Sequence, residues 1–149
     1  MSTALVVAMM VGAGLLMSFQ GPINAALRTN VSVYESALVS FCVGTVLLAL
    51  VVAFAGKGQI GASFRVPPWQ LLGGLIGAVF VTTSLVATPK IGVAGMIACA
   101  FAGQMLGALV IDRAGWFSLA AREVTAWRVL GVALLGAGVW LINFKEVRP

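Results

Sequence analysis

The chain has 149 residues, of which 61% are hydrophobic and only 9% are charged. Soluble domains carry roughly 25% charged residues, so this composition excludes an ordinary soluble protein and predicts an integral membrane protein. The net charge is +5, but the basic residues stand singly between apolar segments. That spacing favours anchors at the membrane edges over a nucleic-acid surface, and we expect no nucleic-acid partner.

Five stretches are long and apolar enough to cross a bilayer, because a helix needs about 20 apolar residues to cross a hydrocarbon core of ~30 Å. They cover about 4–26, 36–54, 69–87, 91–111 and 126–144. We therefore expect an all-α membrane protein with five transmembrane helices, a single domain over residues 1–149, and contact with the lipid bilayer. No Lys or Arg precedes the first stretch, so we interpret it as a retained helix and not as a secretion signal.

The first stretch becomes polar without ending, in the segment SFQGPINAALR. Its residues Gln20, Asn24 and Arg28 follow one another at four-residue spacing and therefore share one helix face. An unsatisfied polar group in lipid costs several kcal/mol, so this face should point into protein or into a wet cavity. Gln104 is a further amide, near the middle of the fourth stretch. We predict that these residues bind substrate in a common cavity, with Arg28 near one mouth.

The same segment contains the pair Gly21 and Pro22. Pro22 has no backbone N–H, which leaves the carbonyl of Ser18 without its helical donor, and Gly21 lets the backbone bend. We expect a helix kink at this pair. The alternative is that the kink only packs helices together and that the segment binds nothing.

Two further proline sites organise the middle of the chain. The pair Pro67 and Pro68 ends a polar loop over 56–68. Proline is favoured at the start of a helix, so we expect the third helix to begin directly after this pair. Pro89 and Lys90 separate the third stretch from the fourth, so we expect these two helices to form a tight antiparallel hairpin.

The residue types exclude most enzymatic chemistry. The chain has no histidine, and its four acids lie at span ends, in loops or in the tail, at Glu35, Asp112, Glu123 and Glu146. No base is available to activate a serine, and we expect no enzyme, cofactor or metal site. Cys42 and Cys99 lie in apolar runs, where a thiol behaves as a small hydrophobe. The hydroxyls of Thr82, Thr83 and Ser84 should bond back to their own helix.

Five spans put the two chain ends on opposite sides of the membrane. One side would hold five basic residues, Lys57, Arg65, Arg113, Arg122 and Arg128, and the other would hold four, Arg28, Lys90, Lys145 and Arg148. The positive-inside rule needs an excess on one side to fix orientation, so this count leaves both orientations open.

In the last stretch, Gly131 and Gly138 lie seven residues apart on one face. Small residues let membrane helices approach closely, so we predict that this face forms the interface between two copies. The alternative is that the last helix packs only within its own chain.

Several segments together resemble the YdcZ-like inner-membrane family of the drug/metabolite transporter superfamily: SFQGPINAALR, SALVSFCVGTVLLAL, PPWQLLGGLIGAVFVTTSLVATPKIG, AGQMLGALVIDRAG and GVALLGAGVWLI. The resemblance implies a short five-span transporter unit in the bacterial inner membrane, one half of an inverted-repeat transporter, paired with a copy of opposite orientation. The last helix also resembles the helix through which small multidrug resistance proteins dimerise. Those relatives carry a glutamate in the first helix, and this chain has none, which argues against proton-coupled export of cations.

The leading hypothesis is a small-solute transporter that works by alternating access as an antiparallel homodimer, or as a heterodimer with a paralogue. The alternative is a non-transporting membrane subunit or assembly factor. A channel is a third possibility, for which the sequence offers no filter. The lack of an intramembrane acid, together with Arg28, favours a neutral, zwitterionic or anionic solute over a cation.

Overall fold

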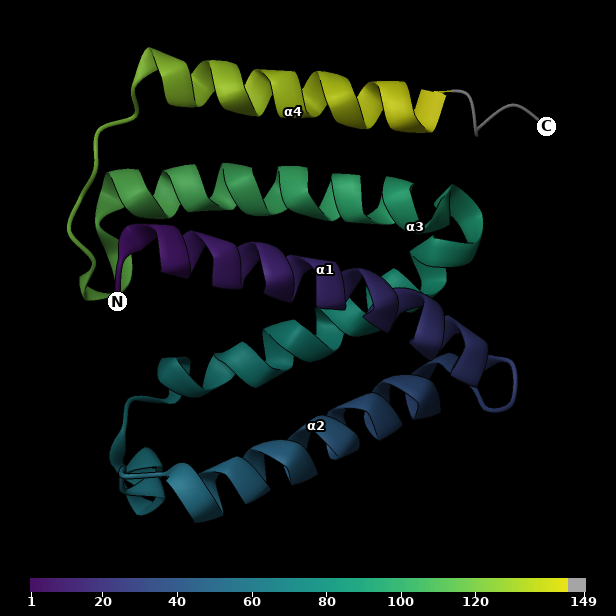
Figure 1. The fold of residues 1–149 in the computed structure, drawn as a ribbon, viewed down its shortest axis with the longest axis vertical. Coiled ribbons are helices and arrows are strands. Elements are labelled where there is room, and N and C mark those ends of the chain that lie inside the picture. Colours follow the sequence, from purple (N-terminus) through teal and green to yellow (C-terminus); the bar gives the residue numbers. More distant parts are fainter. Residues whose placement is uncertain (145–149) are drawn as a thin grey trace. The chain divides into compact units, whose positions relative to one another are not determined.

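The computed structural model describes residues 1–144, and Figure 1 shows their helical fold. The described residues form four α-helices: α1 (Thr3–Arg28), α2 (Val33–Ala55), α3 (Leu72–Ala114) and α4 (Ala126–Phe144). Short 3-10 segments lie in the loops: η1 (Ile60–Arg65), η2 (Pro68–Leu71) and η3 (Trp116–Ser118). Lys145 and Arg148, which contribute to the predicted charge balance, lie outside the described residues.

All four α-helices are long and apolar enough to cross a membrane. Their large side chains point outward, as at Leu16 and Phe54, which are 74% and 90% exposed. Such exposure would be unfavourable in water, but lipid covers these side chains in a bilayer. The helices therefore have the surface of an integral membrane protein.

Helix α3 is too long for a single span. Its 43 residues would extend ~65 Å as one straight helix, against a hydrocarbon core of ~30 Å. The backbone leaves the helical conformation at Gly92, where φ is 71° and ψ is 170°. Helix α3 therefore consists of two helical segments. The prediction of five spans requires each segment to cross the bilayer by itself, and it stays a prediction.

The interruption in α3 does not lie where the sequence suggested. We expected the chain to break at Pro89 and Lys90, but the helix continues through both residues and is interrupted at Gly92. Pro89 removes the N–H that would bind the carbonyl of Leu85, and the Arg28 guanidinium replaces it as donor. The helix therefore tolerates the proline. Glycine at position 92 then allows a φ that other residues rarely adopt.

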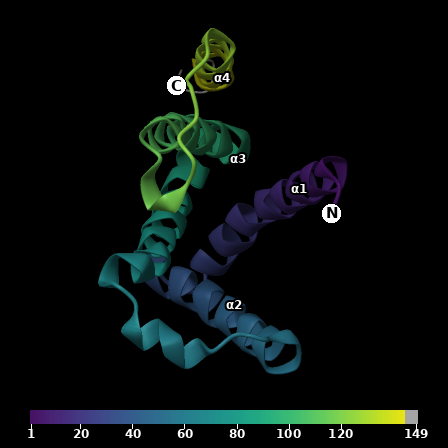
Figure 2. The same cartoon turned by 90° about the vertical axis from the view of Figure 1, so that its left-hand side faces the viewer.

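Packing groups the chain into two compact units, Met1–Ala87 and Thr88–Pro149. The single membrane domain expected from the sequence stays a prediction. The first unit contains α1, α2 and the beginning of α3. Helices α1 and α2 converge at the turn that joins them and splay apart toward their other ends (Figures 1 and 2). The small core of this unit consists of Ala37, Val81 and Leu85, and Val33 and Phe80 pack against it.

Helix α1 begins with a capped first turn, because the Leu5 N–H donates to the Ser2 hydroxyl over 3.3 Å. It then runs as one α-helix to Arg28 with Pro22 in its interior. Its ribbon is continuous through this region in Figure 1. The kink at Gly21 and Pro22 stays a prediction.

The second unit contains the rest of α3 and all described residues of α4. These helical segments run antiparallel and side by side in both views (Figures 1 and 2). The chain passes from α3 to α4 through a loop that is tied back to the helix end, since the Arg122 N–H donates to the Asp112 carbonyl over 2.8 Å.

Candidate functional site

A polar cluster lies in the first unit, close to the turn between α1 and α2. We define it as Asn24, Arg28, Ser36 and Ser40 together with the Leu85 carbonyl. Asn24 is only 5% exposed, and its Nδ2 donates to the Ser40 hydroxyl over 3.2 Å. Ser36 is fully buried and donates to the Asn24 carbonyl over 2.8 Å. The first bond holds the Asn24 side-chain amide against α2, and the second joins Ser36 of α2 to the backbone of α1.

Arg28 completes the polar cluster from the last turn of α1. Its Nη1 donates to the backbone carbonyl of Leu85. Among the described residues, Leu85 is the most buried residue with a large side chain, at 1% exposure. That carbonyl is available because residue 89, four positions later, is a proline without an N–H. The arginine side chain is half-buried and is directed into the unit by this bond.

The polar cluster carries the positive charge of Arg28, which no acid pairs with in the described structure. Glu35 is the single acid of residues 1–87, and it is exposed. The ion pair found among residues 1–144 does not include Arg28. The guanidinium therefore lies half-buried beside a neutral carbonyl and without a counter-ion in the part of the chain that the structure describes. This charge repels cations from the cluster.

The predicted binding residues fall into two groups. Gln20, Asn24 and Arg28 lie on α1 at four-residue spacing, and Gln20 is half-buried with no hydrogen bond among the described residues. Gln104 is exposed and lies on the later segment of α3, in the second unit. The polar cluster therefore contains two of the four predicted residues, and a cavity shared with Gln104 stays a prediction.

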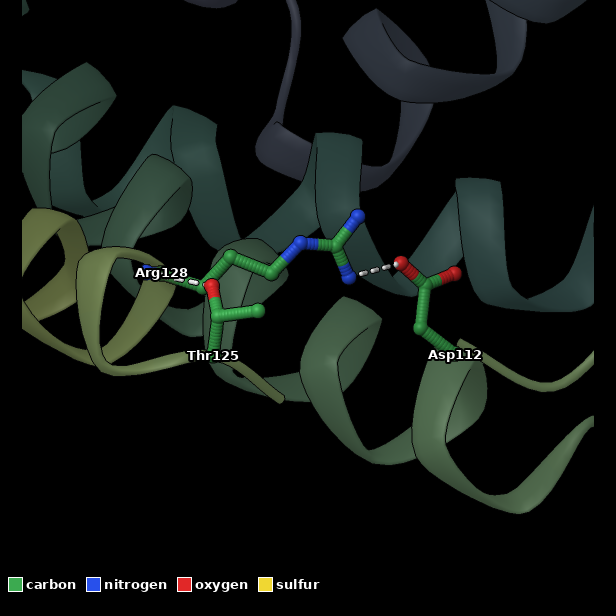
Figure 3. A network of polar contacts seen from close by, with 3 residues as sticks. All are labelled: Asp112, Thr125 and Arg128. Atoms are coloured by element: carbon green, nitrogen blue, oxygen red, sulfur yellow. Dashed lines mark hydrogen bonds and ion pairs between the residues drawn. The ribbon is translucent and has the colours of Figure 1, made fainter. Parts of the chain in front are cut away.

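In the second unit, an ion pair contributes to the lining of an apolar groove. Arg128 Nη1 lies 3.0 Å from Asp112 Oδ2, and both side chains are about one-third exposed, at 34% each. Thr125 supports the arginine, since the Arg128 N–H donates to its hydroxyl over 3.4 Å (Figure 3). The groove measures about 430 Å³ and is lined by Phe101, Met105, Ala108, Leu109, Asp112, Arg128, Gly131, Val132 and Leu135.

Gly131 therefore lines a groove within its own chain, whereas the sequence suggested an interface between copies. A side chain at Gly131 or at Gly138 would meet no atom within 4 Å in the described structure. The space beside both glycines is open, and the predicted dimer interface stays a prediction.

Sequence reasoning missed Asn143 near the end of α4. Its Nδ2 donates to the Val139 carbonyl over 2.8 Å and to Cys99 Sγ over 3.7 Å, whereas its buried Oδ1 has no partner among the described residues. A Cβ at Gly95 would lie 2.5 Å from that oxygen, so the missing side chain makes room for the amide. The available signal was an asparagine inside an apolar stretch.

The polar cluster also includes serines that the sequence did not single out. Ser36 and Ser40 look like ordinary hydroxyls in an apolar helix, where bonding back to the same helix is common. Ser84 shows that behaviour, because it donates to the Val81 carbonyl over 2.8 Å. A four-residue spacing of Ser36 and Ser40, which puts both on the face toward α1, was the signal that could have identified them.

The arrangement can bind a polar solute, but the described residues offer little for covalent chemistry. The polar cluster provides an amide, hydroxyls and a guanidinium, which donate and accept hydrogen bonds. Among residues 1–144, no group of three or more His, Cys, Asp and Glu residues could hold a metal ion. The site therefore has the chemistry of recognition.

A family model and a curated relative both match this chain over most of its length. The family model described as "Putative inner membrane exporter, YdcZ" matches residues 5–141. Inner membrane protein YdcZ of Escherichia coli (strain K12) is 29% identical over 147 residues, covering 95% of this chain and 97% of that protein. No solved structure matches the chain.

The family match covers nearly the whole chain and confirms the family that the sequence segments suggested. The family is described as an exporter family and not as an enzyme family. With its four apolar helices, this multi-pass inner membrane protein belongs to the YdcZ family, whose description is "Putative inner membrane exporter".

Proposed function

We propose that the chain is a small-solute transporter of the bacterial inner membrane that binds its solute along the polar face of α1. The observation that carries the proposal is the polar cluster itself. Asn24 is 5% exposed and engaged through its Nδ2, and a half-buried arginine lies one turn away without an acid in the described structure. Buried polar groups are costly in a membrane helix, and a solute pathway is the usual reason for them.

In this proposal the side-chain amides of Gln20, Asn24 and Gln104 form hydrogen bonds with the solute. Gln20 has no hydrogen bond among the described residues, so both ends of its amide are free for a solute. Asn24 is held by Ser40 and keeps its Oδ1 as an acceptor. Gln104 is proposed as a further amide for the solute. Transporters bind their substrates near the bilayer midplane with groups of this kind.

The working unit in this proposal is an antiparallel homodimer that operates by alternating access. The interruption of α3 at Gly92 supports a count of five spans, and an odd count lets two oppositely inserted copies form an inverted repeat. The near-equal distribution of basic residues allows one product to insert both ways. Open space beside Gly131 and Gly138 supports a helix contact between copies. An oppositely oriented paralogue could replace the second copy.

The binding site is tested by thermal unfolding of the purified protein in the presence of single metabolites. A solute that binds the folded state raises the unfolding temperature with the logarithm of its concentration. Gln20→Ala should abolish the shift and leave folding intact, because its side chain makes no hydrogen bond in the described fold. Gln59→Ala, in an exposed loop, is the matched control and should respond like the wild type.

Two outcomes would contradict the site. If Gln20→Ala and Gln104→Ala both respond to the solute like the wild type, the solute binds elsewhere. If no solute stabilises the protein and none is transported, the alternative of a non-transporting subunit or assembly factor is favoured.

The dimer is tested by topology. Reporters fused to the C-terminus should register on both sides of the membrane, and two or three lysines added to the 56–68 loop should collapse the population to one orientation. A wild-type chain with a single orientation, or a purified protein that is monomeric or parallel, would overturn the homodimer.

A further inference from the structure

The position of the Arg28 guanidinium is unusual for an arginine at the end of a membrane helix. Such a side chain ordinarily extends outward to the lipid headgroups. Here the guanidinium turns inward and donates to the carbonyl of Leu85, a residue with 1% exposure. Its charge is thereby held beside the core of the first unit, to which Leu85 belongs.

The hydrogen bond that holds Arg28 exists because of a proline in another helix. In an uninterrupted helix the Leu85 carbonyl would accept from the N–H of residue 89, and that residue is Pro89. An acceptor left unsatisfied in lipid is unfavourable. The Arg28 guanidinium donates to the Leu85 carbonyl in place of the missing N–H. Pro89 therefore leaves free the acceptor that positions Arg28.

One hydrogen bond to a neutral carbonyl leaves most of the guanidinium unused. The group has five N–H donors in a fixed fork, and it stays charged at any physiological pH. A charge that is partly buried requires an opposite charge or several hydrogen bonds. Among residues 1–144 Arg28 has neither, since its contact is the single bond to Leu85 and Glu35 is exposed and unpaired with it.

We propose that Arg28 is an oxyanion-binding residue, preorganised by the carbonyl that Pro89 leaves free, and that the transported solute carries a carboxylate. The inference rests on the proposed function and names the substrate class of the same site. The free edge of the guanidinium matches a carboxylate with two parallel hydrogen bonds. Asn24, one turn away at about 5–6 Å between Cβ atoms, offers its Oδ1 to a donor group of the same solute.

A matched set of small molecules shows whether binding depends on the charge of the ligand or on its shape. Thermal unfolding of the purified, delipidated full chain is measured with the straight-chain carboxylates from acetate to hexanoate, with their primary amides, and with the corresponding primary amines. Inorganic phosphate and vesicles of anionic phospholipid are separate arms, because a lipid phosphate offers the same oxyanion chemistry. We expect carboxylates to raise the unfolding temperature, and the amides and amines to leave it unchanged.

The variants test the residue. Arg28→Met removes the charge and should weaken carboxylate binding roughly ten- to hundredfold, and Arg28→Lys should fall between it and the wild type. Arg65→Met, at an exposed arginine, should bind like the wild type. If Arg28→Met fails to fold, the double variant Arg28→Met/Pro89→Ala replaces it, because alanine returns the helical donor to Leu85.

Each contrary outcome has a separate meaning. If the amides stabilise the wild type as well as the carboxylates do, or if Arg28→Met/Pro89→Ala binds carboxylates normally, the oxyanion site is overturned and a transporter of neutral solutes remains. If only anionic phospholipid or phosphate stabilises the protein, Arg28 does not bind a solute carboxylate and the inference fails. If no solute of any class binds or is transported, the proposed function fails as well.

Discussion

Arg28 and Pro89 should be energetically coupled, because both determine whether the Leu85 carbonyl has a donor. Arg28→Met removes the donor that the folded chain uses. Pro89→Ala restores the helical N–H and makes that donor redundant. The change at Arg28 should therefore destabilise the protein strongly when residue 89 is proline and weakly when it is alanine.

The magnitude follows from the burial of the acceptor. A buried acceptor without a partner costs about 1–3 kcal/mol, whereas double-mutant cycles on side-chain hydrogen bonds in a membrane protein average about 0.6 kcal/mol and reach about 1.7 kcal/mol. Leu85 is 1% exposed, so water cannot easily replace the lost donor. We expect a coupling free energy of about 1 kcal/mol.

The assay is reversible unfolding in mixed detergent micelles, followed by circular dichroism, for the wild type, both single variants and the double variant. The cycle cancels the separate effects of removing a charge and removing a proline. Arg65→Met is the control for loss of an exposed arginine. Equal destabilisation by Arg28→Met in the wild-type and Pro89→Ala backgrounds would refute the reasoning, since the Leu85 carbonyl would then not be the link.

Three further predictions use the same unfolding assay. Ser36→Ala should cost about 0.6 kcal/mol and at most about 1.7 kcal/mol, because it removes the buried 2.8 Å bond to the Asn24 carbonyl; an unchanged stability would show that the bond contributes nothing. Gly92→Ala should cost about 1–3 kcal/mol, because φ of 71° with ψ of 170° is a conformation essentially limited to glycine; a variant as stable as the wild type would contradict this backbone. Asp112→Asn should cost less than about 1 kcal/mol, because its ion pair with Arg128 is one-third exposed; a larger loss would mean that the pair is shielded from solvent.

The sequence predicted which polar residues share a face of α1, but it did not predict their partners. Four-residue spacing is a local property of a helix, and it correctly put Asn24 and Arg28 on the same stretch of α1. Their partners lie 16 and 57 positions away along the chain, at Ser40 and Leu85. Spacing within one helix carries no information about such distant contacts, so the cluster required the structure.

The break in α3 shows how a distant contact changes a local rule. Proline predicts the end of a helix because it leaves one carbonyl unsatisfied. At Pro89 that carbonyl receives a donor from α1, so the local penalty is reduced and the helix continues to Gly92. The sequence contained both residues, but their connection depends on tertiary packing.

In the last helix, the sequence indicates a contact face but not the group that contacts it. The positions of Gly131 and Gly138 indicate a face that another group can approach closely, but they do not identify that group. In the described structure Gly131 lines a groove shared with α3, and the space beside both glycines is open. Asn143, which was overlooked, contacts Cys99 from a position 44 residues later in the sequence.

Solute counterflow into proteoliposomes tests the central claim, transport through the polar face of α1, most directly. Vesicles that contain the wild-type chain and are loaded with an unlabelled stabilising carboxylate should accumulate the labelled compound. The Gln59→Ala protein should behave in the same way, and the Arg28→Met/Pro89→Ala protein should not accumulate it. Wild-type vesicles that bind the compound and show no counterflow would contradict the account, because the chain would then bind the solute without transporting it.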